Sequence, residues 1–346
     1  MPDRPRWLDD ARRPPASVPA SAHRPAPLLL DDEHRPITTA AAWKARNEQH
    51  RERWTKFLGT IPPHPEPPRL KVLESDERDG VSRQLVRYES EPGLEVEGYL
   101  LRPPGELPKA RTRPGAVVFH STTDATIRQP AGLDGPADKF IGLHLARRGY
   151  VAFCPRCYLW QYSAGGKIIQ AVDWLRKRHP GVTGMAKMLA DAVRAIDVLL
   201  SQPDVDPGRV GSIGHSLGAK EVLYLSAFDP RVRATVSSEG GVSIGQSNWE
   251  APWYLGESAK RPGFPLDHAQ ILGMSAPRAF FLLGGNSADG DASWPTVEAA
   301  LPVWELLGAR DALGVFNHGG GHAYPPEASR RAYEWLDWFL RADLSK

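Results

Sequence analysis

The feature that most restricts the fold is a five-residue segment, Gly214-His215-Ser216-Leu217-Gly218, which matches the pattern G-x-S-x-G. It directly follows an apolar run at residues 210–213 and precedes a stretch with helical character. A serine on a tight turn between a strand and a helix leaves little room for side chains two positions away, so both flanking positions are glycine. The segment therefore predicts a strand, a sharp turn and a helix, with the Ser216 hydroxyl pushed into a cleft.

The chain around this segment alternates between strand-like and helix-like patterns. Alternation of this kind indicates a parallel sheet covered by helices on both faces. Earlier β-like runs are separated only by short turns such as Asp79-Gly80 and Pro92-Gly93. We expect an α/β fold whose mostly parallel central sheet has an antiparallel N-terminal start. The strand-like runs are at residues 70–73, 83–88, 94–101, 116–119, 150–153, 210–213, 234–236, 278–283 and 313–316.

The composition suggests three parts along the chain. Residues 1–36 contain eight prolines and no hydrophobic periodicity, which predicts a disordered or draped arm. Residues 37–68 combine a helix, in which Trp43 and Trp54 share one face, with a proline-rich connector. Residues 69–346 would form the α/β domain, and the segment 240–270 is long enough to be a lid-like insertion.

The charge balance and the cysteine count exclude several classes of protein. Lys and Arg number 43 against 41 Asp and Glu, a net charge of +2 that favours neither nucleic acid nor a membrane surface as a partner. Cys154 and Cys157 are the only cysteines, too few for a zinc site or a disulfide framework. We therefore expect no metal and no cofactor.

The hydropathy pattern bears on the compartment. No apolar run approaches the length of a membrane-spanning helix, so we expect a soluble protein. The N-terminus has only Leu28 to Leu30 as an apolar core, and no export signal is visible. The sequence as it stands predicts a cytoplasmic protein, or a periplasmic or secreted one if a leader has been removed.

A serine hydroxyl is a weak nucleophile and needs a base, usually a histidine held by a carboxylate. His322 lies in the glycine-rich loop between the last strand-like run and the C-terminal helix, which makes it the expected base, with His318 as its rival. His318 and His322 could also be read as a pair of metal ligands. However, the three glycines between them argue against a helix, which is the element that usually presents two histidines at this spacing.

Three carboxylates compete to orient the base. Asp289 follows the strand-like run 278–283 and gives the chain order Ser216, Asp289, His322, so it is the first candidate. Glu239 follows the preceding strand and could approach the same imidazole. Asp291 lies two residues beyond Asp289 and stays open as a third candidate.

An ester-cleaving serine also requires donors for the oxyanion. The backbone N–H of Leu217, at the start of the predicted helix, is one candidate. The second should come from the loop after the run 116–119, where Thr122 is the first choice and Ser121 the second. Aromatic residues such as Trp249 and Trp294 follow other strands and could wall a substrate cleft.

From about residue 43 to the C-terminus the chain resembles the acetyl xylan esterase-like and dienelactone hydrolase-like serine esterases. This resemblance implies the α/β-hydrolase fold and hydrolysis of a small acyl or carbohydrate ester through an acyl-enzyme, for example an acetyl group on a plant polysaccharide. It is carried by residues 114–123, 146–151, 204–221 and 227–239.

The chain is also similar to glucuronoyl esterases, because Lys220 stands four residues after the nucleophile and Glu239 follows the next strand. The similarity implies substrate-binding roles for Lys220 and Trp294, and hydrolysis of uronic acid esters as the alternative activity. Those enzymes have arginine directly after the nucleophile, where this chain has Leu217. Two alternatives remain. The protein could be a serine peptidase with the same triad, or a carbohydrate-binding protein without catalytic activity.

Overall fold

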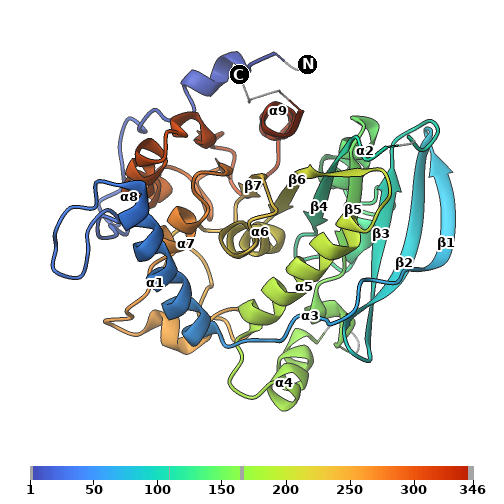
Figure 1. Cartoon of the computed structure of the whole chain (residues 1–346), viewed down its shortest axis with the longest axis horizontal. Helices are drawn as coiled ribbons and strands as arrows, with labels where there is room; N and C mark the ends of the chain where they lie inside the picture. Colours follow the sequence, from blue (N-terminus) through green and yellow to red (C-terminus); the bar gives the residue numbers. More distant parts are fainter. Residues whose placement is uncertain (1–2, 109, 164–166, 342–346) are drawn as a thin grey trace.

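The computed structural model describes residues 3–108, 110–163 and 167–341. Within these residues, nine strands form one sheet in the order β1-β2-β3-β5-β4-β6-β7-β8-β9 (Figure 1). The first three pairings in this order, β1-β2, β2-β3 and β3-β5, are antiparallel. The remaining pairings, from β5-β4 to β8-β9, are parallel. The strands are β1 (Lys71–Arg78), β2 (Val81–Glu91), β3 (Leu94–Arg102), β4 (Arg113–Phe119), β5 (Val151–Pro155), β6 (Val205–His215), β7 (Ala234–Ser238), β8 (Ala279–Gly284) and β9 (Leu313–Asn317).

Helices cover both faces of the sheet. Helices α5 and α6 pack on one face, and α2 and α9 pack on the other (Figure 1). The expected α/β architecture with an antiparallel start is thus confirmed. The helices are α1 (Ala40–Leu58), α2 (Ile141–Arg147), α3 (Tyr158–Gln161), α4 (Ile168–Arg178), α5 (Gly184–Leu200), α6 (Leu217–Phe228), α7 (His268–Met274), α8 (Trp294–Leu306) and α9 (Pro326–Arg341), with short 3-10 turns between them.

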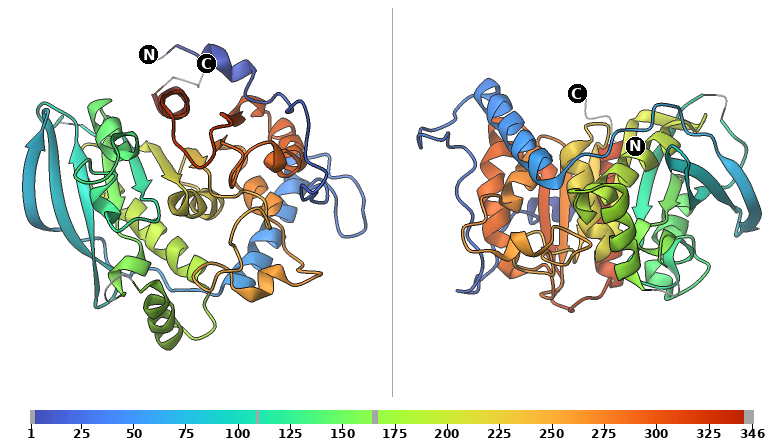
Figure 2. Two further views of the ribbon diagram at one scale, coloured as in Figure 1. Left: turned by 180° about the vertical axis from the view of Figure 1, so that it is seen from behind. Right: turned by 90° about the horizontal axis from the view of Figure 1, so that it is seen from below.

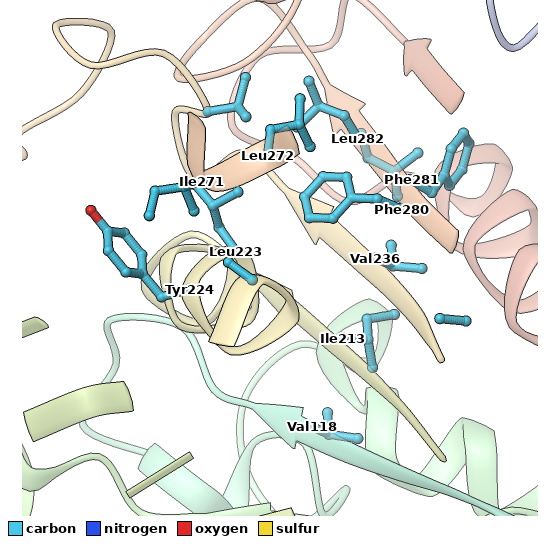
Figure 3. Close-up of a cluster of buried hydrophobic side chains, with 14 of the residues drawn as sticks. Val118, Ile213, Leu223, Tyr224, Val236, Ile271, Leu272, Phe280, Phe281 and Leu282 are labelled. Carbon is cyan, nitrogen blue, oxygen red and sulfur yellow. The ribbon is translucent and has the colours of Figure 1, made fainter. Parts of the chain in front are cut away.

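The burial of the strands follows from their place in the sheet. Strands β5, β7 and β8 are buried along their whole length, as expected for parallel strands covered on both faces. Edge strand β1 has no buried residue and carries Lys, Glu, Asp and Arg, which discourage pairing with another sheet. The main core joins side chains of β4, β6, β7 and β8 to those of α6 and α7 (Figure 3).

The N-terminal arm lies against the α/β domain. Among residues 3–36, which the structure describes, the only helical turn is η1 (Arg6–Asp9), yet Trp7 packs on Phe281 with ring centroids 5.1 Å apart and stacks near Trp335. The Val315 N–H donates to the Ala11 carbonyl oxygen at 2.6 Å, so the arm pairs with edge strand β9. Figure 2 shows this blue segment running along the outside of the red C-terminal elements.

Helix α1 connects the arm to the rest of the molecule. The Thr39 side chain accepts a hydrogen bond from the Ala42 N–H at its start, and Gly59, with φ +79°, ends it. Trp43 and Trp54 are buried and α1 packs on α7. In the part of the chain that the structure describes, no helix is both long and apolar enough to cross a membrane.

Candidate active site

Ser216 occupies the sharp turn that the sequence predicts, between the last residue of β6 and the first residue of α6. Its φ of 60° and ψ of −115° are unusual for a residue other than glycine. A Cβ at Gly218 would lie 2.4 Å from the Phe119 carbonyl oxygen, and one at Gly214 would lie 2.2 Å from the Gly218 backbone. Only glycine at both positions allows this turn.

His322 meets the serine from the loop that follows β9. Its Nε2 lies 2.9 Å from Ser216 Oγ, which places the hydroxyl in position to donate to the ring. The loop is tied to the end of β8, because the Gly321 N–H donates to the Gly285 carbonyl oxygen at 2.7 Å. His318, the rival base, accepts a hydrogen bond at Nδ1 from the Gly320 N–H instead.

The carboxylate at the imidazole belongs to Glu239, directly after β7. Its Oε2 lies 3.2 Å from His322 Nδ1 and accepts a hydrogen bond from the Ala288 N–H at 2.7 Å, while its Oε1 accepts one from the Gly285 N–H. Burial alone would raise the pKa of Glu239, but the hydrogen bonds from His322 and these two N–H groups outweigh it and lower that pKa. The base is therefore held by an ionised, buried carboxylate.

Asp289, the first candidate for this role, lies elsewhere. Its Oδ2 and Oδ1 accept hydrogen bonds from the N–H groups of Gly241 and Val242, both at 2.7 Å. Asp291 accepts a hydrogen bond from Asn317 Nδ2 at 2.7 Å. The expected order Ser216, Asp289, His322 is thus not the arrangement found. Strand β7 pairs with β6 in the sheet, which delivers Glu239 beside the nucleophile, whereas Asp289 turns toward the backbone that follows Glu239.

The oxyanion donors expected from the sequence adjoin the elbow. Leu217 begins α6, and the N–H groups in the first turn of a helix have no intrahelical partner. Strand β4 pairs with β6 so that Phe119 lies opposite Gly214, and the loop containing Thr122 starts there. Thr122 itself is exposed, and its role as the second donor stays a prediction.

His215 is a second histidine of the site, and the sequence assigns it to the elbow without a chemical role. Its ring is buried, with Nδ1 3.0 Å from Ser238 Oγ and its centroid 4.9 Å from that of His322. Burial lowers the pKa of His215 to about 2, so the ring is neutral and adds no charge next to the base. Its place directly before the nucleophile, at the end of β6, is the signal that could have identified it.

Known proteins share both sequence and fold with this chain. The model of the Dienelactone hydrolase family matches residues 97–255. A glucuronoyl esterase from Solibacter usitatus, 20% identical, superposes with a TM-score of 0.72 over 95% of this chain and 100% of its own. The chain has the α/β-hydrolase fold, and its residues 97–255 are similar to the dienelactone hydrolase family.

Two relatives of this α/β-hydrolase carry the name 4-O-methyl-glucuronoyl methylesterase. That of Podospora anserina is 25% identical over 349 residues, which cover 90% of this chain and 66% of the relative. That of Sodiomyces alcalophilus, numbered 1, is 28% identical over 156 residues, covering 37% of this chain. The matched part of this α/β-hydrolase spans 32% of the Sodiomyces protein's length.

The residues expected to bind substrate are buried in this α/β-hydrolase. Trp249 is 1% exposed, Trp294 is 6% exposed and Lys220 is 4% exposed. Lys220 Nζ donates to the Gly240 carbonyl oxygen and to Ser247 Oγ, the latter at 2.7 Å. All three side chains are thus engaged inside the protein, whereas the His322 side chain is 46% exposed.

The described ranges hold no group of three or more His, Cys, Asp or Glu side chains that could bind a metal ion. Cys154 and Cys157 are both buried free thiols. Burial raises the pKa of each thiol well above its ordinary value, so neither is primed as a thiolate.

Proposed function

We propose that this α/β-hydrolase is a serine carboxylic ester hydrolase that acts on a small acyl or carbohydrate ester. The observation that carries the proposal is the continuous hydrogen-bonded series from Glu239 through His322 to Ser216, with contacts of 3.2 and 2.9 Å. A nucleophile, a base and a buried orienting carboxylate are the parts required for acyl transfer.

The first half-reaction forms the acyl-enzyme. Ser216 Oγ attacks the ester carbonyl while its proton moves to His322 Nε2, and Glu239 stabilises the imidazolium through Nδ1. The Leu217 N–H, at the positive end of α6, stabilises the oxyanion together with a donor from the Thr122 loop. When the tetrahedral intermediate collapses, the alcohol leaves with the proton from Nε2.

The second half-reaction releases the acid. Water loses a proton to His322 Nε2 and attacks the acyl carbonyl, and the same donors hold the new oxyanion. Collapse returns the proton to Ser216 Oγ and restores the enzyme. Since His322 is 46% exposed, both water and an ester attached to a larger molecule can reach the serine.

A second candidate substrate class is uronic acid esters. The names of the Podospora and Sodiomyces relatives favour it. Leu217 takes the place of the arginine expected in such enzymes, and the buried Lys220 would have to exchange its internal hydrogen bonds for bonds to a sugar. Acetylated carbohydrate therefore stays our first choice of substrate.

A substrate panel tests the function. We would measure initial rates on para-nitrophenyl esters of increasing acyl length, acetylated xylan and a benzyl glucuronate ester. Ser216→Ala should lose at least about 1,000-fold in kcat, because the covalent step disappears. Ser329→Ala, a serine on the surface of α9, serves as the matched control and should keep the wild-type rate.

The outcome separates the alternatives. Preference for short acyl groups or acetylated xylan supports the deacetylase, and preference for the glucuronate supports the uronic ester hydrolase. If folded wild-type protein cleaves none of these esters, or if Ser216→Ala retains the wild-type rate, the proposed function is wrong and amide substrates or a binding role should be examined.

A further inference from the structure

The turn that carries Glu239 is conformationally strained. Glu239 has φ +56° and Gly241 has φ +81°. A residue other than glycine in this region costs on the order of 1–3 kcal/mol and persists only where its surroundings hold it. The backbone of Glu239 is tied to β8 by a 2.9 Å hydrogen bond from its N–H to the Leu283 carbonyl oxygen, but the residues after it lie in a loop.

A buried carboxylate holds the N–H groups of this loop. Asp289, 2% exposed, accepts from Gly241 and Val242, and Ser293 Oγ donates to it at 3.0 Å. Two consecutive backbone N–H groups that converge on one carboxylate form short, charge-assisted hydrogen bonds with it. These bonds hold the segment immediately after Glu239 in place.

Two further side chains hold the carbonyl groups of the same loop. Lys220 Nζ donates to the Gly240 carbonyl oxygen, and Trp249 Nε1 donates to that of Gly241 at 2.7 Å. Lys220 Nζ also lies 4.1 Å from the centre of the Trp249 ring, so the two donors pack against each other. The loop is therefore held by a carboxylate on its N–H groups and by amine and indole donors on its carbonyl groups.

We propose that Asp289, Lys220 and Trp249 are positioning residues that hold the Glu239 carboxylate on His322 Nδ1. Their hydrogen bonds go to residues 240–242, next to Glu239, so they act through Glu239. This inference rests on the proposed function and deepens it. It gives the three residues a role in setting the efficiency of the base, in place of the catalytic or substrate-binding roles expected from the sequence.

A double-mutant cycle tests the inference. Asp289→Asn, Lys220→Met and Trp249→Phe are each made in the wild type and in Glu239→Gln, and kcat, KM and melting temperature are measured with para-nitrophenyl acetate. In the wild type each should lower kcat by about 10- to 100-fold with little change in KM, because a misplaced catalytic group loses rate rather than affinity. In Glu239→Gln the same substitutions should cost less than about threefold, since no carboxylate remains to be positioned.

A matched control separates positioning from general destabilisation. Trp304 is fully buried and donates from Nε1 to the Arg278 carbonyl oxygen at 3.0 Å, far along the chain from the Glu239 loop. Trp304→Phe should lower the melting temperature about as much as Trp249→Phe but leave kcat unchanged. If Asp289→Asn or Lys220→Met fails to fold, Trp249→Phe still tests the positioning role. This substitution removes one N–H donor and keeps an aromatic ring in the core.

Several results would overturn the inference. Equal losses of kcat in both backgrounds would indicate a structural role unrelated to Glu239, and a raised KM with unchanged kcat would indicate substrate binding. Wild-type values of kcat and KM in the folded Asp289→Asn, Lys220→Met and Trp249→Phe variants would also contradict it. An inert wild type would instead refute the proposed function, so the two failures are distinguishable.

Discussion

At the scale of single residues, the two strained positions of the site lie side by side. Ser216 and Glu239 both have positive φ angles, and each directly follows one of the adjacent parallel strands β6 and β7. The Ser216 N–H donates to the Ser238 carbonyl oxygen at 2.8 Å, which joins the two turns. Strain of this kind is retained where the surrounding structure fixes it, and here Ser216 and Glu239 lie at opposite ring nitrogens of His322.

Lys220 should make folding stability depend on pH. Burial lowers its pKa from 10.5 to about 7, so between these values the unfolded chain binds a proton that the folded protein lacks. Stability rises with pH wherever the unfolded state binds more protons. We therefore expect the stability of wild type relative to Lys220→Met to increase above pH 7 by on the order of 1 kcal/mol per pH unit.

Urea denaturation of both proteins from pH 6 to pH 9.5 measures this difference. At pH 6 the difference should change little with pH, because Lys220 is then largely protonated in both states, and the slope should steepen through pH 7 as the folded protein loses this proton. A difference that stays flat up to pH 9.5 would mean that the buried amine keeps its ordinary pKa.

At the scale of elements, the loops after β7, β8 and β9 form an interlocking group. Gly285, after β8, donates its N–H to the Glu239 carboxylate and accepts at its carbonyl oxygen from the Gly321 N–H. Asn317 Nδ2, at the end of β9, donates to Asn286 Oδ1 at 2.8 Å. Glu239 and His322 thus follow different strands but are both tied to the loop after β8.

Gly285 should accordingly be intolerant of a side chain. A Cβ there would lie 1.9 Å from the Gly321 carbonyl oxygen, so Gly285→Ala must displace the loop that carries His322. We expect a loss of about tenfold or more in kcat and about 1–3 kcal/mol of stability, measured by steady-state kinetics and urea denaturation.

Gly208→Ala is the control for this change. At Gly208 the nearest atom to an added Cβ is Asp206 Oδ1, at 3.3 Å, and the site is on the surface. Its effect should stay within about 0.5 kcal/mol. If Gly285→Ala keeps the wild-type kcat per folded molecule, the loop after β8 does not set the position of the base.

At the scale of the whole molecule, the N-terminal arm completes the core at the β9 edge. Trp7 is 8% exposed, packs on Phe281 and Trp335, and donates from Nε1 to Glu334 Oε2 at 2.5 Å. Strand β9 has no neighbouring strand on its outer side within the described residues, and Ala11 meets Val315 there. The arm therefore shields apolar surface and an edge strand that would otherwise face water.

Trp7→Ala should show how much the arm contributes. Loss of this side chain should lower the free energy of unfolding by about 3–5 kcal/mol, as for other buried tryptophans, while kcat of the folded enzyme stays unchanged. Arg13→Ala, which removes only an exposed ion pair with Asp10, should change stability by less than about 0.5 kcal/mol. Near-equal stabilities of the two variants, by thermal and urea denaturation, would mean that the arm contributes little.

Features that depend on a local pattern could be predicted from the amino-acid sequence alone. The glycines around Ser216 predict the elbow because backbone crowding in that turn is a local property, and strand and helix periodicity predict the layers. His322 could be recognised because a glycine-rich loop before the last helix is visible along the chain. The structure brings Ser216 and His322 together at 2.9 Å.

Which carboxylate meets His322 can be seen only in the folded chain. Asp289 and Glu239 both follow strands, and chain order cannot tell which side chain points at the imidazole and which binds backbone N–H groups. The same holds for Lys220 and Trp249, whose residue types suit sugar binding but whose side chains are buried against residues 240–242. The physical reason is that burial and hydrogen-bond partners depend on contacts between segments far apart in sequence, and those contacts exist only once the sheet has assembled.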